Sequence, residues 1–245
     1  MHIGDEMETP EYEYTVGNMP VKYSTNEKDL GVIIDRKLSF DLHINEKVKK
    51  ANSMAGWIRR SFVYMDEVLF KLLYTAMVRM HLEYCAVVWS PYLTKYIDQL
   101  EQVQIRATKM VPGLRDKAYP ERLKILKLPT LTYRRLRGDM VTVYKIMNNI
   151  YHEECCPKLP TIESATGRPG RQLMQLYQSR SRLDTRKFSF TQRVVSVWNS
   201  LPEKVVTANT LDTFKTRLDD TWKNERILYH YKEPLRGERI TKKLK

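Results

Sequence analysis

Side chains that could perform phosphoryl transfer or hydrolysis are few in this 245-residue chain, and they are poorly placed for it. Two-metal phosphoryl transfer needs carboxylates that hold two ions roughly 4 Å apart on a rigid strand or turn. The only adjacent aspartates, Asp219 and Asp220, follow Leu218 inside an expected amphipathic helix, so a solvated helix face explains them better than catalysis. Asp5 and Glu6 lie in the N-terminal stretch and are no better placed. We therefore expect no catalytic residue, and the chain by itself is not expected to be an enzyme.

Soft metal ligands gather at one place in the sequence, His152, Cys155 and Cys156. A zinc site needs a second, separated ligand pair that this cluster lacks, so we expect no metal there. The chain has no Walker-type glycine loop and no Gly-x-Ser-x-Gly nucleophile turn, so no nucleotide or other cofactor is expected. The odd cysteine count, completed by Cys85, favours reduced thiols and an intracellular protein of the nucleus or cytoplasm.

Positive charge is the strongest compositional feature. The chain has 42 Lys+Arg against 29 Asp+Glu, a net charge of +13 and a pI of about 9.5. This balance favours a polyanionic partner, either nucleic acid or an acidic membrane surface. No run of residues approaches the roughly 18 apolar residues of a membrane span, and the acidic N-terminal stretch is unlike a secretory signal. We therefore expect no membrane partner and favour nucleic acid.

Basic and polar side chains recur on one side of an expected helix that lies between Pro91 and Pro112. They follow steps of four and three, which places them on one helix face: Lys95, Gln99, Gln102, Arg106 and Lys109. A face of this kind can follow a phosphate backbone through its long donors. Ordinary solvation of a helix surface is the alternative.

Two further expected helices repeat the pattern. The first helix carries the row Lys49, Asn52, Gly56 and Arg59, with Lys47, Lys50 and Arg60 beside it. The long helix near residue 140 carries the row Arg135, Gly138, Thr142 and Lys145, with Arg134 and Arg137 beside it. Gly56 would let a sugar–phosphate backbone approach the helix closely. Three such rows in one basic chain favour phosphate binding over solvation alone.

Aromatic rings could add base stacking to these phosphate contacts. Core packing is the better interpretation for most of the large rings, including Trp89, Trp198 and Trp222. Trp57 lies next to Arg59 and Arg60 in the sequence, and it is the ring for which stacking deserves a test.

Hydrophobic periodicity predicts a mainly α fold that begins with a β-hairpin. Tyr12–Gly17 and Val21–Ser24 flank the turn signal Gly17-Asn18, and the β-branched run Gly31–Ile34 follows. From residue 44 the period becomes helical. The expected inward faces are Ile44, Val48, Ala51, Ala55, Ile58 and Phe62; Leu69, Leu72, Leu73, Ala76, Met77 and Met80; Ile97, Leu100, Val103, Ala107 and Met110; and Tyr133, Leu136, Met140, Val143, Met147 and Ile150. These helices can form one bundle.

Composition changes after Tyr151, where proline, glycine and small polar residues become frequent. We divide the chain into a β-hairpin region (1–40), a helical thumb-like bundle (41–151), a linker (152–171), a smaller mixed α/β region (172–230) and a basic tail (231–245). In the mixed region, we expect a strand or two between residues 173 and 190, then a helix that ends before Pro202. Asn209 or Thr210 can cap a last amphipathic helix.

Six sequence segments occur in a recognisable order: EKDLGVIID, LSFDLHINEKVKKANSMAGWIRRSF, LYTAMVRMHLEYCAVVWSPY, LEQVQIRATKMVPGL, YPERLKILKLPTLTYRRLRGDMVTVYKIMN, and RVVSVWNSLPEKVV with LDTFKTRLD. Their succession, over about residues 27–220, resembles the C-terminal part of reverse transcriptases from jockey-like LINE (non-LTR) retrotransposons. In that family these segments follow the catalytic palm. The resemblance implies an RNA-directed DNA polymerase origin, with the end of the palm and the primer grip before residue 40, then a thumb, then a C-terminal extension.

The same resemblance places the primer-grip turn at Asp29, Leu30, Gly31 and Val32. Two departures from the family stand out. Met80 occupies the position where the family usually has proline, and the aromatic-x-Asp-Asp motif that binds the catalytic metals is absent. The resemblance therefore implies a transposable-element fragment that grips a template–primer duplex of RNA, DNA or both, and whose other partner is the missing palm. The alternative is a domesticated helical module that binds another protein.

Overall fold

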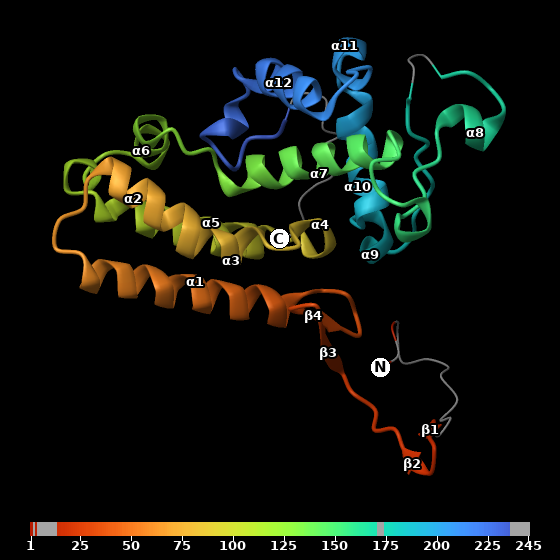
Figure 1. Ribbon diagram of the computed structural model, residues 1–245, viewed down its shortest axis with the longest axis horizontal. Helices are drawn as coiled ribbons and strands as arrows, with labels where there is room; N and C mark the ends of the chain where they lie inside the picture. Colours follow the sequence, from red (N-terminus) through yellow and green to blue (C-terminus); the bar gives the residue numbers. More distant parts are fainter. Residues whose placement is uncertain (2, 4–13, 171–173, 236–245) are drawn as a thin grey trace.

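A computed structural model describes residues 1, 3, 14–170 and 174–235, and it is mainly helical with small β-hairpins near the N-terminus (Figure 1). The long helix α1 (Asp41–Ser61) lies along one side of a layer formed by α2, α3 and α5. Helix α7 (Leu131–Met147) crosses the middle of the molecule, and the C-terminal helices cover its other side. The predicted fold class is therefore confirmed.

Two antiparallel hairpins open the described chain. β1 (Thr15–Val16) pairs with β2 (Met19–Pro20) across the predicted Gly17-Asn18 turn, and β3 (Asn26–Asp29) pairs with β4 (Val32–Asp35). The first residues of the predicted Tyr12 strand lie outside the described residues.

A single carboxylate directs the chain from the second hairpin into α1. The Asp35 carboxylate accepts backbone N–H bonds from Lys37 (3.0 Å), Ser39 (3.1 Å) and Phe40 (2.6 Å). Asp and Asn side chains commonly organise turns in this way. The start of α1 is therefore fixed relative to the hairpin.

The predicted inward faces of α1 and α5 (Thr94–Ala107) are confirmed. Ile44, Val48 and Ala51 are buried on α1, and Leu100, Val103 and Ala107 are buried on α5. Both helices contribute to a first hydrophobic core that extends from Val32 to Leu131. The spacing of three and four residues was sufficient to predict the buried face because each helix has one apolar face and one polar face.

The inward face predicted for residues 69–80 is right only in part. Leu69, Leu73 and Met77 pack partly buried against the first core, whereas Leu72, Ala76 and Met80 are exposed. The fully buried side chains are instead Phe70, Tyr74, Val78 and Leu82. Here α2 (Glu67–Leu73), the π-helix η1 (Tyr74–Arg79) and α3 (Met80–Glu83) form one continuous helix. A π-helix has i→i+5 hydrogen bonds and more residues per turn than an α-helix, so steps of four stay on one side. Met80 has helical dihedral angles, with φ of −55° and ψ of −36°.

Helix α7 belongs to both halves of the molecule. Its first residue, Leu131, closes the first core, whereas Tyr133, Met140, Val143 and Tyr144 form part of a second core that continues to Leu235. Short helical segments connect α5 to α7: η2 (Thr108–Met110), η3 (Pro112–Leu114) and α6 (Tyr119–Leu126). The second core thus begins on α7, before the boundary that the composition places after residue 151.

Short helices dominate the C-terminal region. They are η4 (Glu153–Cys155), α8 (Ile162–Thr166), α9 (Asp184–Lys187), α10 (Phe190–Asn199), α11 (Glu203–Val206), α12 (Leu211–Trp222) and η5 (Arg226–Leu228). Thr210, one of the two residues predicted to cap α12, does so by accepting the Thr213 N–H at 3.1 Å. The strands expected between residues 173 and 190 are reduced, within the described residues, to one antiparallel bridge between Thr161 and Leu176. Residues 184–187 are helical instead.

Candidate nucleic-acid interface

The basic row predicted on α1 is exposed. Lys49, Lys50, Arg59 and Arg60 all point to solvent, and within the described part of the chain none lies within 4 Å of a carboxylate. Gly56 lies in the same row, and a Cβ built there would lie 3.6 Å from the Arg60 guanidinium. This surface can therefore offer its cations to an external anion. Lys47 differs from the prediction because its side chain is buried and lies 3.8 Å from Glu46.

The row on α5 adjoins the row on α1. Lys95, Gln102, Arg106 and Lys109 are exposed. The Gln99 side-chain amide donates to Asn45 Oδ1 at 2.8 Å, and this bond joins the two helices near the beginning of each. The helices are packed together. Two rows that were predicted separately therefore form one surface, the α1–α5 face.

The row predicted on α7 is wrong as a free surface. Arg135 is only 6% exposed and its Nη2 donates to Thr132 at 3.2 Å, so it cannot reach a phosphate. Arg134 is held by Glu83, and Arg137 makes a two-pronged ion pair with Asp219 at 2.6 and 2.7 Å. Their positions follow from α7 packing against both cores, which buries Arg135 and leaves Arg134 and Arg137 partly exposed but paired with carboxylates.

Buried polar groups fix α5 against α7 and were not recognised in the sequence. Glu101 is fully buried, and it accepts hydrogen bonds from the Tyr119 hydroxyl at 2.5 Å and from the Leu131 N–H at 3.2 Å. Burial raises the pKa of Glu101, while the Tyr119 hydrogen bond and the Arg135 charge oppose that rise. Gln104 completes the group by accepting from Tyr74 at 2.6 Å. A carboxylate satisfied in this way is structural, and it positions the helix that carries the α5 row.

The residues predicted to be primer-grip-like form the turn between β3 and β4. Leu30 and Gly31 have positive φ angles of 43° and 82°, as a tight two-residue hairpin turn requires, and Leu30 is 83% exposed. The Tyr84 hydroxyl donates to the Leu30 carbonyl at 2.8 Å, which ties the turn to the end of α3. Asp29 pairs with Val32 across the turn, and Val32 is buried.

A histidine beneath the hairpin holds the next backbone group. His43 Nδ1 accepts the Ile33 N–H at 3.1 Å, and its ring lies 5.1 Å from Trp89. Burial, followed by the nearby charge of Lys47, lowers the pKa of His43 from 6.5 to about 4. His43 is therefore neutral near pH 7, as its acceptor role requires.

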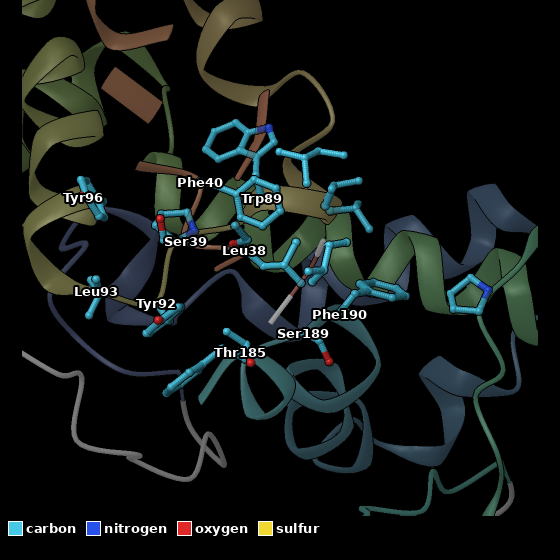
Figure 2. Close-up of a pocket in the computed structure, with 18 residues that line it drawn as sticks. Leu38, Ser39, Phe40, Trp89, Tyr92, Leu93, Tyr96, Thr185, Ser189 and Phe190 are labelled. Carbon is cyan, nitrogen blue, oxygen red and sulfur yellow. The ribbon is translucent and has the colours of Figure 1, made fainter. Parts of the chain in front are cut away.

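An apolar pocket of about 470 Å³ opens between the start of α1, the α4–α5 connection and the α9–α10 region, where α4 is Ala86–Trp89 (Figure 2). Phe40, Trp89, Tyr96 and Phe190 supply ring surface, and Tyr92 stacks on Phe188 with 4.4 Å between centroids. Its lining has hydroxyl groups but no charged side chain. The described lining therefore offers no group suited to acid–base catalysis near neutral pH or to binding a metal.

The remaining sequence candidates are also placed. Trp57 is 48% exposed beside the α1 row, whereas Trp89, Trp198 and Trp222 are buried, as the core interpretation predicted. Among the described residues, no group of three or more His, Cys, Asp or Glu side chains is arranged to hold a metal ion.

Comparisons with known proteins add no relative: no family model, curated protein or solved structure matches the chain. In the described ranges no helix combines the length and the apolar character needed to cross a membrane.

Proposed function

We propose that this chain is a nucleic-acid-binding fragment of a retrotransposon reverse transcriptase, and that it grips the sugar–phosphate backbone through the α1–α5 face. The observation that carries this proposal is the meeting of two basic rows on adjoining helices, with cations that have no carboxylate partner in the described residues. Exposed cations of this kind release condensed counterions from nucleic acid when they bind phosphates.

The proposed contacts give affinity and register but little sequence preference. Lysine and arginine side chains reach phosphates from this face, and such phosphate contacts carry no sequence information directly. The exposed Leu30-Gly31 turn would steady a strand end, in keeping with the primer-grip resemblance. Catalysis would come from a palm domain that carries the metal-binding aspartates, and this palm is the second proposed partner. The proposed location is inside the cell, where the nucleic acid is.

The test is binding of a fluorescein-labelled RNA–DNA hybrid by the full chain, followed by anisotropy over a salt series. Phosphate binding predicts that log K falls linearly with log salt, by about 0.9 for each phosphate neutralised. Duplexes of unrelated sequence should bind within a few fold of one another. Absence of binding at low salt, or binding that salt does not weaken, would favour the rival interpretation of a protein-interaction module.

A further inference from the structure

A second concave surface lies apart from the α1–α5 face. It is a groove of about 720 Å³ between the α2–η1 helix and the segment that joins α6 to α7. Ile125–Pro129 forms one wall, and Arg134 reaches it from α7. Figure 1 shows α6 on the side of α2 that faces away from α1. None of the residues that line the groove belongs to α1 or α5, so a ligand seated there would not occupy their basic rows.

One wall of the groove presents apolar side chains to solvent. Val68 is 78% exposed and Leu72 is 63% exposed, and they lie one helical turn apart on α2. Val63 and Tyr64, just before α2, are also exposed. Single exposed apolar residues are ordinary, but two that lie one helical turn apart in the lining of a groove are typical of a surface that another molecule covers.

The groove also has more positive charge than its own acids neutralise. Arg79 and Arg134 share one carboxylate, Glu83, so two guanidinium groups face a single negative charge. Lys71 and Lys127 are exposed at the rim, and no ion pair joins either to another described residue. Glu67 is the only acidic side chain in the lining. Glu83 therefore neutralises only part of the charge of the two arginines, and the two lysines at the rim have no ion-pair partner among the described residues.

The pKa of Arg79 is consistent with two arginines whose charges are only partly neutralised. Partial burial, followed by the neighbouring charge of Arg134, lowers the pKa of Arg79. A guanidinium in this position remains charged because its ordinary pKa is so high. An added carboxylate would offset both the desolvation and the repulsion between the two arginines.

The chemistry of the walls decides what kind of ligand fits. One wall is helical, and the other is the turn that follows α6. In that turn the Lys127 and Leu128 N–H groups already donate to Lys124 and Leu123 carbonyls at 3.2 and 3.0 Å, and Pro129 has no N–H, so an extended strand could not pair with either wall. A helix satisfies its own backbone and can place side chains four residues apart against Val68 and Leu72. A phosphate backbone would bring charge against these two apolar side chains and leave them without apolar contact.

We propose that this groove binds an acidic amphipathic helix of another protein, whose apolar residues cover Val68 and Leu72 and whose carboxylates pair with Lys71, Arg79, Lys127 and Arg134. The site is separate from the proposed nucleic-acid surface and does not depend on it. Its partner is defined by two features together, an apolar pair at i and i+4 and flanking glutamates or aspartates.

The probe is a fluorescein-labelled synthetic peptide of about 16 residues, or roughly four helical turns, with leucines at i and i+4 positions and glutamates beside them. Two control peptides have the same composition with scattered leucines, or lysine in place of glutamate. Anisotropy with the full chain should show saturable binding of the first peptide, with a Kd below about 100 μM, and at least tenfold weaker binding of both controls.

Two variants test the residues. Lys71→Glu with Lys127→Glu should weaken peptide binding at least tenfold, and Leu72→Ser should weaken it about tenfold through lost apolar contact. The matched control, Lys204→Glu with Lys223→Glu, changes the net charge equally at exposed positions of α11 and the end of α12 that do not line the groove, and it should alter binding less than twofold. Thermal melting of each variant establishes that it is folded.

The proposal is overturned if the acidic peptide does not saturate, if the scattered-leucine peptide binds equally well, or if the two charge reversals have equal effects. Hybrid binding is titrated on the same samples. A chain that binds the hybrid but not the peptide refutes the groove alone, and a chain that binds the peptide but not the hybrid refutes the proposed function alone. Loss of hybrid binding in Lys71→Glu with Lys127→Glu but not in the matched control would assign the groove to nucleic acid and overturn the peptide proposal.

Discussion

Removing two cations from the middle of the α1–α5 face should weaken nucleic-acid binding without weakening the fold. The double variant is Arg106→Ala with Lys109→Ala. Both side chains are exposed and point away from the buried seam of Val103 and Ala107. Neither makes an ion pair with another described residue, so no internal partner loses its charge compensation.

The size of the effect follows from the number of phosphates released. Two lost phosphate contacts should reduce the slope of log K against log salt by roughly 1.8, at about 0.9 for each contact. The same factor predicts binding weaker by roughly 60-fold at 0.1 M salt and by roughly 20-fold at 0.2 M. The free energy of unfolding should change by no more than about 0.5 kcal/mol, as at other exposed positions.

The assay is fluorescence anisotropy of a labelled RNA–DNA hybrid at several salt concentrations, with chemical denaturation as the stability control. A matched double variant, Lys204→Ala with Lys223→Ala, removes two exposed lysines from α11 and the end of α12, helices that Figure 1 shows on the side of α7 away from α1. It should change affinity by less than about threefold, because neither lysine belongs to the α1–α5 face and salt screens an exposed charge that contacts no phosphate.

An unchanged slope in Arg106→Ala with Lys109→Ala would refute the assignment of α5 to the backbone-binding surface. Equal losses in the two double variants would show that net charge, and not this face, controls binding. A loss of affinity accompanied by a lower free energy of unfolding would instead show that these two side chains support the fold.

Four other predictions follow from the structure. Because burial lowers the pKa of His43 to about 4, the unfolded chain binds a proton at this residue more tightly than the folded chain between pH 6.5 and about 4. The free energy of unfolding should therefore decrease by up to about 3 kcal/mol as the pH is lowered through that window. Urea unfolding of His43→Asn, which keeps an acceptor for the Ile33 N–H, should lack this component. Asp139→Ala should cost about 3–5 kcal/mol in chemical denaturation, because it leaves the Arg193 guanidinium, now 2.9 and 3.0 Å from the carboxylate oxygens, partly buried and unpaired; adding Arg193→Met should restore much of the loss. Limited proteolysis should cut first between about residues 156 and 171, yet the two pieces should co-elute under native conditions because α7 contributes to both cores; early cleavage inside α5 would contradict this. The chain alone should extend no primer with any metal, and extension abolished by changing Asp219 would overturn that expectation.

The sequence predicted those helices in which apolar and polar faces are clearly separated. On α1 and α5, steps of three and four gave both the buried seam and the exposed row opposite it. That the two rows adjoin could not be predicted, because the bond between Gln99 and Asn45 joins residues that are far apart in the sequence. The turn at Gly17-Asn18 was predictable from residue type alone.

Two kinds of feature could not be read from the sequence. The π-helix shifts the inward face of residues 74–79, and because apolar residues occur all around this helix, periodicity gave no unique face. Arg135 was misplaced for a different reason: it shares helical spacing with exposed residues, but α7 is covered on two sides, so its polar face is also internal. Glu101 was missed because a buried carboxylate has no distinctive sequence pattern.

Helix α7 also determines which truncated forms of this protein can persist. A chain that ends just after α7 would keep the first core, yet it would leave Tyr133, Met140, Val143 and Tyr144 uncovered along one stripe. A stripe of this kind promotes aggregation and degradation. Chains without the last helices would thus be removed although their first core is intact, so the C-terminal helices are needed for solubility even where they contact no ligand.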